Sequence, residues 1–253
     1  MALFPIEMSL SKRLPKEIAA SQTDEMKAAG IFYEHDDVNV DIGRAIIIGP
    51  EGSPYANCPL MFRFEFSRDY PFSPPSVKFM TSDGTTRFHP NLYVNGKVCL
   101  SILGTWSGPR WAPAMSISTI LSSIQSLLEP NPITNEPGWE TMTLENEKAK
   151  FYADFVHSRL TSYTFRNLYR WKYGIMPAEW TEFAGLLEEC GGAVLEKLQQ
   201  SILLRPAEPD TTYTNIVYTM SGTTDWEGLR ILAGKIVPAE NPLKDSIDRN
   251  TVA

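Results

Sequence analysis

The residues best suited to covalent chemistry lie between His89 and Pro113, where the sequence reads HPNLYVNGKVCLSILGTWSGPRWAP. Cys99 follows the Asn95-Gly96 pair, a strong signal for a tight turn, so we expect Cys99 near the surface at the rim of a loop. A free thiol has an ordinary pKa of about 8.5, and its thiolate form is the best nucleophile among the side chains. From the residues alone, a buried core thiol is an equally good interpretation.

The polar neighbours of Cys99 restrict what a reactive thiol could do. A cysteine protease needs a histidine base, but His89 is flanked by Pro90 and suits a structural role that fixes the loop. The amide of Asn91 could donate to an oxyanion at an acyl carbon on Cys99, and such donors contribute about 3–4 kcal/mol in characterised enzymes. A thiol with an amide and no strong base favours acyl transfer from an activated thioester over peptide hydrolysis.

Composition excludes several other classes of function. The chain has 253 residues, a net charge of −7 and a pI near 5.1, which argues against binding the phosphate backbone of nucleic acids. No apolar run approaches the roughly 18 residues of a membrane span, and the N-terminus lacks the pattern of a secretory signal. We therefore expect a cytoplasmic protein, with the nucleus as a second compartment, that binds neither nucleic acid nor membranes.

Cysteine and histidine spacing predicts neither disulfides nor a metal site. The three cysteines are far apart, and no pair has the spacing of a zinc ligand set. The histidines form no cluster in the sequence. The residues concerned are Cys58, Cys99, Cys190, His35, His89 and His157. We expect no metal and no other cofactor.

The elements that must position Cys99 follow from periodicity. Residues 8–29 predict a helix ending at Gly30, with Pro15 marking its start or a bend. Alternating or β-branched runs at 38–42, 44–50, 60–67 and 76–80 predict an antiparallel meander, covered on its apolar face by a helix. Residues 88–113 predict a long, irregular loop, and an apolar stripe predicts a helix over 116–128, with Ser116 as its N-cap. The fold class is therefore α+β.

The second part of the chain has mostly helical patterns in place of short strand patterns. Helical patterns occupy 143–172, 178–203 and 225–236, whereas 213–219 favours a strand or an extended segment. We predict a core domain over residues 1–148 and a mostly helical extension over 149–253. The polar tail after about residue 242 is expected to be mobile.

Several motifs together resemble one family. HPNLYVNGKVCLSIL resembles the active-site signature of ubiquitin-conjugating enzymes, in which the catalytic cysteine stands eight residues after the Asn of HPN. Residues 46–80 are similar to that family's central sheet and its Tyr-Pro-Phe-x-Pro-Pro loop, and WAPAMSIS matches its Trp-Ser-Pro-Ala loop. The resemblance covers about residues 8–140 and implies the UBC fold. An inserted GTWSGPR at 104–110 and NEPGWE at 135–140 resemble a long member with a C-terminal extension.

The resemblance implies a thioester mechanism. Cys99 would accept the C-terminal glycine of ubiquitin or a ubiquitin-like modifier from an activating enzyme and pass it to a substrate lysine. ATP is used by the activating enzyme, so this chain needs no cofactor. A lysine amine, with a pKa of about 10.4, is mostly protonated at pH 7, and a nearby carboxylate could help it lose the proton. Glu136, before Pro137, aligns with the family residue in that role; a solvated turn residue is the alternative, and Asn135 is the fallback.

The resemblance also implies partner surfaces. Phe72, Pro113 and Ala114 match the loops that contact RING- or HECT-type ligases, and Trp111 is expected to buttress the active-site loop. The activating enzyme, which in the long relative is the non-classical one, would use the basic face of the first helix. That face comprises Lys12, Arg13 and Lys16, although Pro15 departs from the family pattern there.

Two alternatives stay open. The chain could conjugate a different ubiquitin-like protein, because the recognition surface is spread over many weakly diagnostic residues. It could also be a non-catalytic ubiquitin-binding variant, but such variants lack the cysteine that this chain retains.

Overall fold

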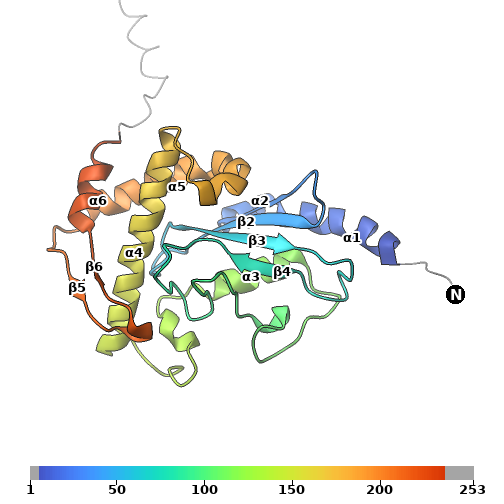
Figure 1. Cartoon of the computed structure of the whole chain (residues 1–253), viewed down its shortest axis with the longest axis horizontal. Helices are drawn as coiled ribbons and strands as arrows, with labels where there is room; N and C mark the ends of the chain where they lie inside the picture. The colour runs from blue at the N-terminus through green and yellow to red at the C-terminus, as the bar shows by residue number, and fades with distance from the viewer. Residues whose placement is uncertain (1–5, 237–253) are drawn as a thin grey trace, which may run out of the picture.

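The centre of the structure is a four-stranded antiparallel sheet in the order β1-β2-β3-β4 (Figure 1). The computed structural model describes residues 6–236, with side chains from Arg13 onward. The strands are β1 (Ile31–His35), β2 (Ile42–Ile48), β3 (Pro59–Glu65) and β4 (Ser76–Phe79). In the register of the sheet, Ala45 pairs with Tyr33 on one side and with Phe62 on the other. The predicted meander and α+β class are confirmed.

The first strand is not where the sequence predicted it. Residues 38–41 form a turn, because the carboxylate of Asp36 accepts the backbone N–H of Val38 (3.0 Å) and of Asn39 (2.8 Å). Val38 is 95% exposed, so the alternation of 38–42 does not reflect a sheet face. The real strand, β1, buries Ile31 and Tyr33, and its short alternating pattern follows directly after the predicted helix.

Two helices precede the sheet where one was predicted. Helix α1 (Ile6–Ser21) runs through Pro15, and α2 (Asp24–Ala28) follows after Thr23, whose hydroxyl accepts the N–H of Met26. Gly30 ends this region with a left-handed φ of 79°, a conformation that glycine adopts without steric cost. A Pro in the interior of a helix removes one hydrogen bond, but the helix continues past it here.

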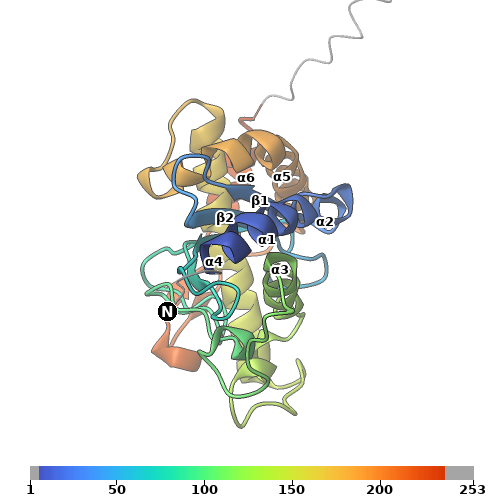
Figure 2. The same ribbon diagram turned by 90° about the vertical axis from the view of Figure 1, so that its right-hand side faces the viewer.

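A buried carboxylate joins α1 to the start of α3 (Ile117–Ser126), and Figure 2 shows these two helices lying next to each other. Glu17 is only 7% exposed, and it accepts the backbone N–H of Ile117 at 3.1 Å and the hydroxyl of Tyr70. The predicted cap is also present, since Ser116 and Thr119 form a capping box at the N-terminus of α3.

The second part of the chain folds around one long helix, α4 (Glu147–Lys172), which crosses one end of the sheet (Figure 1). The 3₁₀ helix η3 (Ala178–Phe183) leads into α5 (Ala184–Leu204), and α6 (Trp226–Ala233) packs on both α4 and α5. Between α5 and α6 lie two short paired strands, β5 (Thr212–Tyr213) and β6 (Gly222–Thr223), joined through η4 (Val217–Thr219). The predicted helices are confirmed; the expected mobile tail lies outside the described residues.

Both faces of the sheet are buried, although the sequence predicted a cover on one face only. Along β3, consecutive residues point to opposite faces, yet Leu60, Met61 and Phe62 are all fully buried. Helix α5 contacts β1 and β2. At the polar end of the sheet, Glu182 of η3 pairs with Arg63 at 3.1 Å and with Arg44 at 3.6 Å. One continuous hydrophobic cluster includes side chains from both the sheet and the later helices.

The start of the long loop is fastened to the end of the α3 region by His89, which is fully buried. Its Nδ1 accepts the backbone N–H of Asn91 at 2.9 Å, so Nε2 carries the hydrogen and donates to the carbonyl of Leu127, also at 2.9 Å. Burial lowers the pKa of His89 to about 3. The ring is therefore neutral throughout the physiological range.

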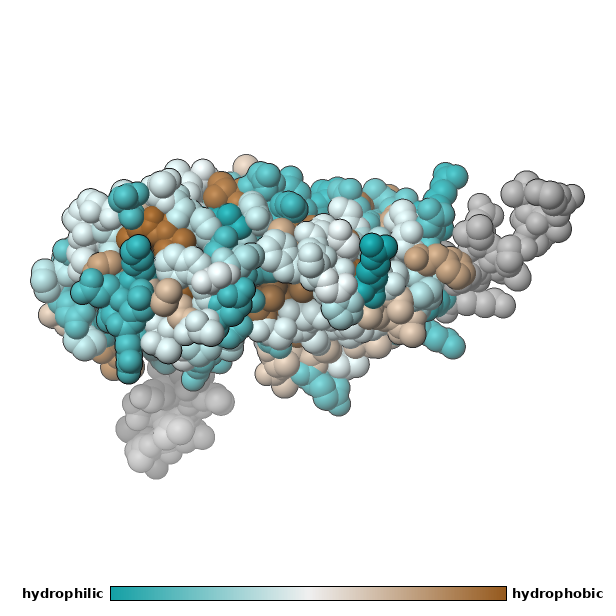
Figure 3. All heavy atoms as spheres, turned by 90° about the horizontal axis from the view of Figure 1, so that it is seen from below, coloured by the Kyte–Doolittle hydropathy of each residue, from teal (hydrophilic) through white to brown (hydrophobic). Residues whose placement is uncertain are grey.

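The outer surface is mixed in character. Seen from below, hydrophobic side chains form small patches separated by hydrophilic ones (Figure 3). Within residues 6–236, no helix has the length and apolarity required to cross a bilayer.

The shared core predicts that the extension and the sheet lose stability together. Leu187 of α5 is fully buried, so Leu187→Ala should lower the free energy of unfolding by about 2–5 kcal/mol through lost burial and a residual cavity. Urea unfolding, followed by both tryptophan fluorescence and circular dichroism, should show one transition at a lower midpoint. Leu204→Ala, in the same helix but 83% exposed, is the control and should change the midpoint little. Two separated transitions would contradict a shared core.

The buried His89 predicts a specific dependence of stability on pH. Above pH 6.5 the ring is neutral in both states, whereas between pH 6.5 and 3 only the unfolded chain binds the proton. His89 should therefore lower stability by roughly 1.4 kcal/mol for each pH unit below 6.5. Nitrogen chemical shifts of the ring should stay those of the neutral form to pH 4, and His89→Gln should flatten the slope of stability against pH. A ring that protonates near pH 6 would exclude this assignment.

Candidate active site

Cys99 is paired with Asn91 by two hydrogen bonds. The backbone N–H of Cys99 donates to the carbonyl of Asn91 at 2.8 Å, and the side-chain amide of Asn91 donates to the carbonyl of Cys99 at 2.7 Å. A neighbouring bridge between Leu92 and Val98 continues the pairing, and the Asn95-Gly96 turn closes it. The eight-residue spacing between Asn and Cys is therefore the length of a folded-back loop that brings the two residues together.

The expectation that Cys99 lies near the surface was wrong for this conformation, because the residue is only 1% exposed. The pairing with Asn91 draws the cysteine segment inward from the tip of the turn. The three thiols nevertheless differ in their surroundings. Cys58 and Cys190 belong to the hydrophobic cluster, and burial raises their pKa values to about 11 and about 12. Among the described residues, Cys99 is not part of that cluster, although both of its chain neighbours are.

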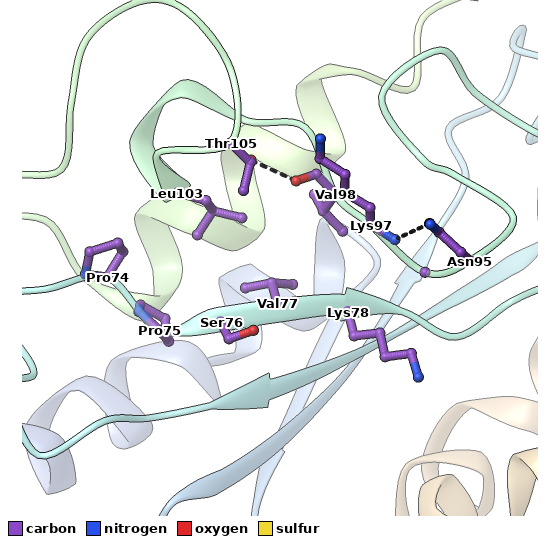
Figure 4. A pocket seen from close by; sticks show the side chains of 11 residues that line it. Pro74, Pro75, Ser76, Val77, Lys78, Asn95, Lys97, Val98, Leu103 and Thr105 are labelled. Atoms are coloured by element: carbon purple, nitrogen blue, oxygen red, sulfur yellow. Dashed lines mark hydrogen bonds between the residues drawn. The ribbon is translucent and has the colours of Figure 1, made fainter.

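The inserted segment 104–110 folds against the cysteine segment. Thr105 donates its hydroxyl hydrogen to the carbonyl of Val98 at 2.6 Å and accepts the backbone N–H of Leu100 at 2.9 Å, so it fastens the chain on both sides of Cys99. Figure 4 shows Thr105 bonded to Val98 beside a groove of about 540 Å³. Its other wall is β4 with Pro74 and Pro75. Residues 104–110 themselves are exposed.

The amide of Asn91 is only partly committed. One N–H of its nitrogen is used by the Cys99 carbonyl, and its oxygen Oδ1 is buried with no hydrogen-bond partner in the described part of the chain. Exchanging the two amide atoms would face Oδ1 against the Cys99 carbonyl, so the orientation is fixed by repulsion between two acceptors. The structure thus places the Asn91 amide against the backbone of Cys99, with one N–H not used by another described residue; its role toward an oxyanion stays a prediction.

Glu136 lies after the 3₁₀ helix η2 (Pro132–Asn135) and is bonded by a residue of the extension. The hydroxyl of Tyr218, in η4, donates to Oε2 of Glu136 at 2.5 Å. The fallback residue, Asn135, instead turns its amide to Glu129 at 3.1 Å. Of the two, Glu136 is therefore the one that the second part of the chain contacts.

Arg87 connects Tyr218 to the loop that holds the cysteine. Its guanidinium lies between two rings, 3.7 Å from the centroid of Tyr93 and 4.2 Å from that of Tyr218. The same group donates to the carbonyl of Pro90 at 2.5 Å. Positively charged guanidinium groups are attracted to the faces of aromatic rings. Arg87, Tyr218 and Thr105 carry no sequence pattern that marks them, because their partners lie far away in the chain or in an insertion.

The predicted partner residues lie around two adjoining loops. Phe72 is 63% exposed, and Pro113 and Ala114 are exposed as well. Trp111 donates its indole N–H to the carbonyl of Pro71 at 2.6 Å and packs beside Tyr70, so it joins the two loops.

The predicted basic face is only partly available. Arg13 donates to the carbonyls of Pro113 and Met115, the latter at 2.5 Å, and pairs with Glu17. Its guanidinium is therefore tied to the loop that precedes α3. Lys16 is exposed, and the side chain of Lys12 lies outside the described residues. Within the described residues, no group of three or more His, Cys, Asp or Glu side chains is arranged to hold a metal ion.

Comparisons with known proteins agree with one another. A family model described as ubiquitin-conjugating enzyme matches residues 13–158. The chain is 54% identical over 112 residues to ubiquitin-conjugating enzyme E2 Z of Homo sapiens. This match covers 44% of this chain and 32% of that protein. It is 44% identical over 137 residues to probable ubiquitin-conjugating enzyme protein 17 of Caenorhabditis elegans, covering 51% and 19%. The chain thus spans about a third or less of the length of these two relatives.

Solved structures include similar chains. Human ubiquitin-conjugating enzyme E2 G1 is 32% identical, with 47% of this chain and 93% of that chain covered and a TM-score of 0.41. The E2 domain of a Toxoplasma gondii ubiquitin-conjugating enzyme is 29% identical, with 61% and 95% covered and a TM-score of 0.45. The family match covers more than half of the 253 residues and contains Cys99, Asn91 and Glu136. The resemblance predicted from the HPN motif is confirmed, and the chain belongs to the ubiquitin-conjugating enzyme family.

Proposed function

We propose that this chain carries ubiquitin or a ubiquitin-like modifier as a thioester on Cys99 and transfers it to a lysine of a protein substrate. The observation that supports this function is the reciprocal pairing of Cys99 with Asn91, which sets one nucleophile beside one amide donor. Membership of the family adds the reaction class. The other two cysteines are core residues with raised pKa values and suit no such role.

The first step is an exchange of thioesters. The thiolate form of Cys99 attacks the acyl carbon of the modifier's C-terminal glycine, a new C–S bond forms, and the C–S bond to the activating enzyme breaks with release of that enzyme's thiolate. The remaining N–H of Asn91 stabilises the oxyanion formed in between. Because Cys99 is 1% exposed, charging requires a local rearrangement around the cysteine.

The second step transfers the acyl group to nitrogen. The lysine amine attacks the acyl carbon, a C–N bond forms, and the C–S bond to Cys99 breaks. Glu136 orients the amine and accepts its proton, since an amine is nucleophilic only when uncharged. The ligase would dock on Phe72, Pro113 and Ala114, and the activating enzyme would use Lys16 and the remainder of the first helix, including Lys12 and Arg13.

Charging tests the nucleophile directly. Incubation with an activating enzyme, ATP and ubiquitin should give an adduct on non-reducing gels that disappears with thiol. Cys99→Ser should give at most an oxyester that resists thiol, because oxygen replaces sulfur as the acyl carrier. Cys190→Ala removes a thiol from the core and is the matched control, which should still charge. Absence of an adduct with any modifier and either ubiquitin-activating enzyme would exclude the carrier function.

Discharge tests the carboxylate. With Cys99 charged beforehand, Glu136→Gln should slow transfer to free lysine by about 10²-fold, the lower end of the range for losing a general base. Formation of the thioester should be unaffected, since Glu136 acts only in the second step. Asn135→Ala, at the neighbouring position, is the control. A normal discharge rate in Glu136→Gln with a slow rate in Asn135→Ala would move the role to the fallback residue.

A further inference from the structure

We propose that Tyr218, supplied by the C-terminal extension, is a positioning residue that holds the carboxylate of Glu136 for the acceptor amine. This role rests on the proposed function, since it concerns the second transfer only. Figure 1 shows the β5–β6 segment running along α4. The bond from Tyr218 to Glu136 joins this segment to the residue that follows η2. The extension would thus supply one group to the site of a reaction whose nucleophile lies in the core.

The contact between the two side chains has the polarity that this role requires. Tyr218 donates its hydroxyl hydrogen to Oε2 of Glu136. Burial, together with this bond, raises the pKa of Tyr218 well above the ordinary value for a phenol, so the hydroxyl keeps its hydrogen and remains a donor. Within the described part of the chain, the second oxygen, Oε1, accepts no hydrogen bond. One oxygen is held by the protein and the other is left for an incoming amine.

Tyr218 is itself held from three directions. The guanidinium of Arg87 lies over one face of its ring, and the ring of Tyr152 meets it edge-on at 5.8 Å between centroids. The backbone contributes as well, because Tyr218 and Thr219 have left-handed φ values of 61° and 57°. Non-glycine residues keep this conformation only where the surroundings enforce it, and such positions concentrate at functional sites.

The same contacts link Tyr218 to the cysteine. Arg87 donates to the carbonyl of Pro90, the residue before Asn91, while Met220 of the extension accepts the backbone N–H of Arg87 at 3.2 Å. The extension is therefore attached both to the carboxylate and to the loop that carries Asn91. A free glutamate in an exposed turn would sample several rotamers, whereas this one is bound to a fixed ring.

The test compares Tyr218→Phe with wild type, using Tyr213→Phe as the control. Both variants remove one hydroxyl from the extension, but Tyr213 packs against Phe151 and Phe155 and contacts neither Glu136 nor Arg87. Tyr218→Phe should charge normally and should discharge to free lysine about tenfold more slowly, the size expected for losing a hydrogen bond to a charged group. Tyr213→Phe should match wild type in both steps.

Two further measurements separate positioning from a merely structural role. Discharge to hydroxylamine, which is uncharged at neutral pH and needs no carboxylate, should be the same in Tyr218→Phe and wild type. In a Glu136→Gln background, Tyr218→Phe should have no further effect, because its role acts through that carboxylate. Unchanged or faster lysine discharge, an equal slowing toward hydroxylamine, or additive effects would overturn the proposal. Failure of the wild-type chain to charge would instead remove the proposed function, and this role with it.

Discussion

The arrangement of the site depends on the reciprocal pairing of Asn91 with Cys99. One hydrogen bond runs from the cysteine backbone to the asparagine backbone, and the other returns from the asparagine side chain to the cysteine carbonyl. The ring of His89 accepts the backbone N–H of Asn91 and donates to the carbonyl of Leu127, at the end of the α3 region. A buried polar group without a partner costs free energy. Loss of any one of these hydrogen bonds would therefore destabilise the loop. The cysteine is thereby placed by the same bonds that stabilise the loop.

The sequence was informative where a residue's role is local. The stripe of α3, its Ser116 cap and the Asn95-Gly96 turn depend on neighbours within a few positions, and the structure has them as predicted. The four-stranded meander was also predictable, since β2 and β3 are rich in β-branched and aromatic residues. The turn at 38–41 was mistaken for a strand because the Asp36 carboxylate, not the alternation, decides its backbone.

The parts of the site that could not be predicted come from contacts between distant residues. The bond from Tyr218 to Glu136 joins positions 82 residues apart, and the cation–π contact places Arg87 between an element of the core and one of the extension. Cys99 itself shows the same limit. Its turn predicted a surface position, but the degree of burial depends on Asn91 and on how Thr105 folds the inserted segment back. The spacing of eight residues indicated the pairing with Asn91, but no periodic or spacing signal indicated the bonds of Thr105 or the resulting degree of burial.

The cover over the outer face of the sheet affects what else this protein could bind. Arg44 of β2 and Arg63 of β3 are paired with Glu182 of η3, and Met61, two residues before Arg63, is fully buried. Partly exposed ion pairs contribute at most about 1 kcal/mol each. The buried apolar contacts therefore contribute most of the free energy that keeps this face covered. A second protein that binds this face would have to displace a segment of the same chain. Because that segment is covalently tethered, its effective concentration at the face does not depend on how dilute the protein is.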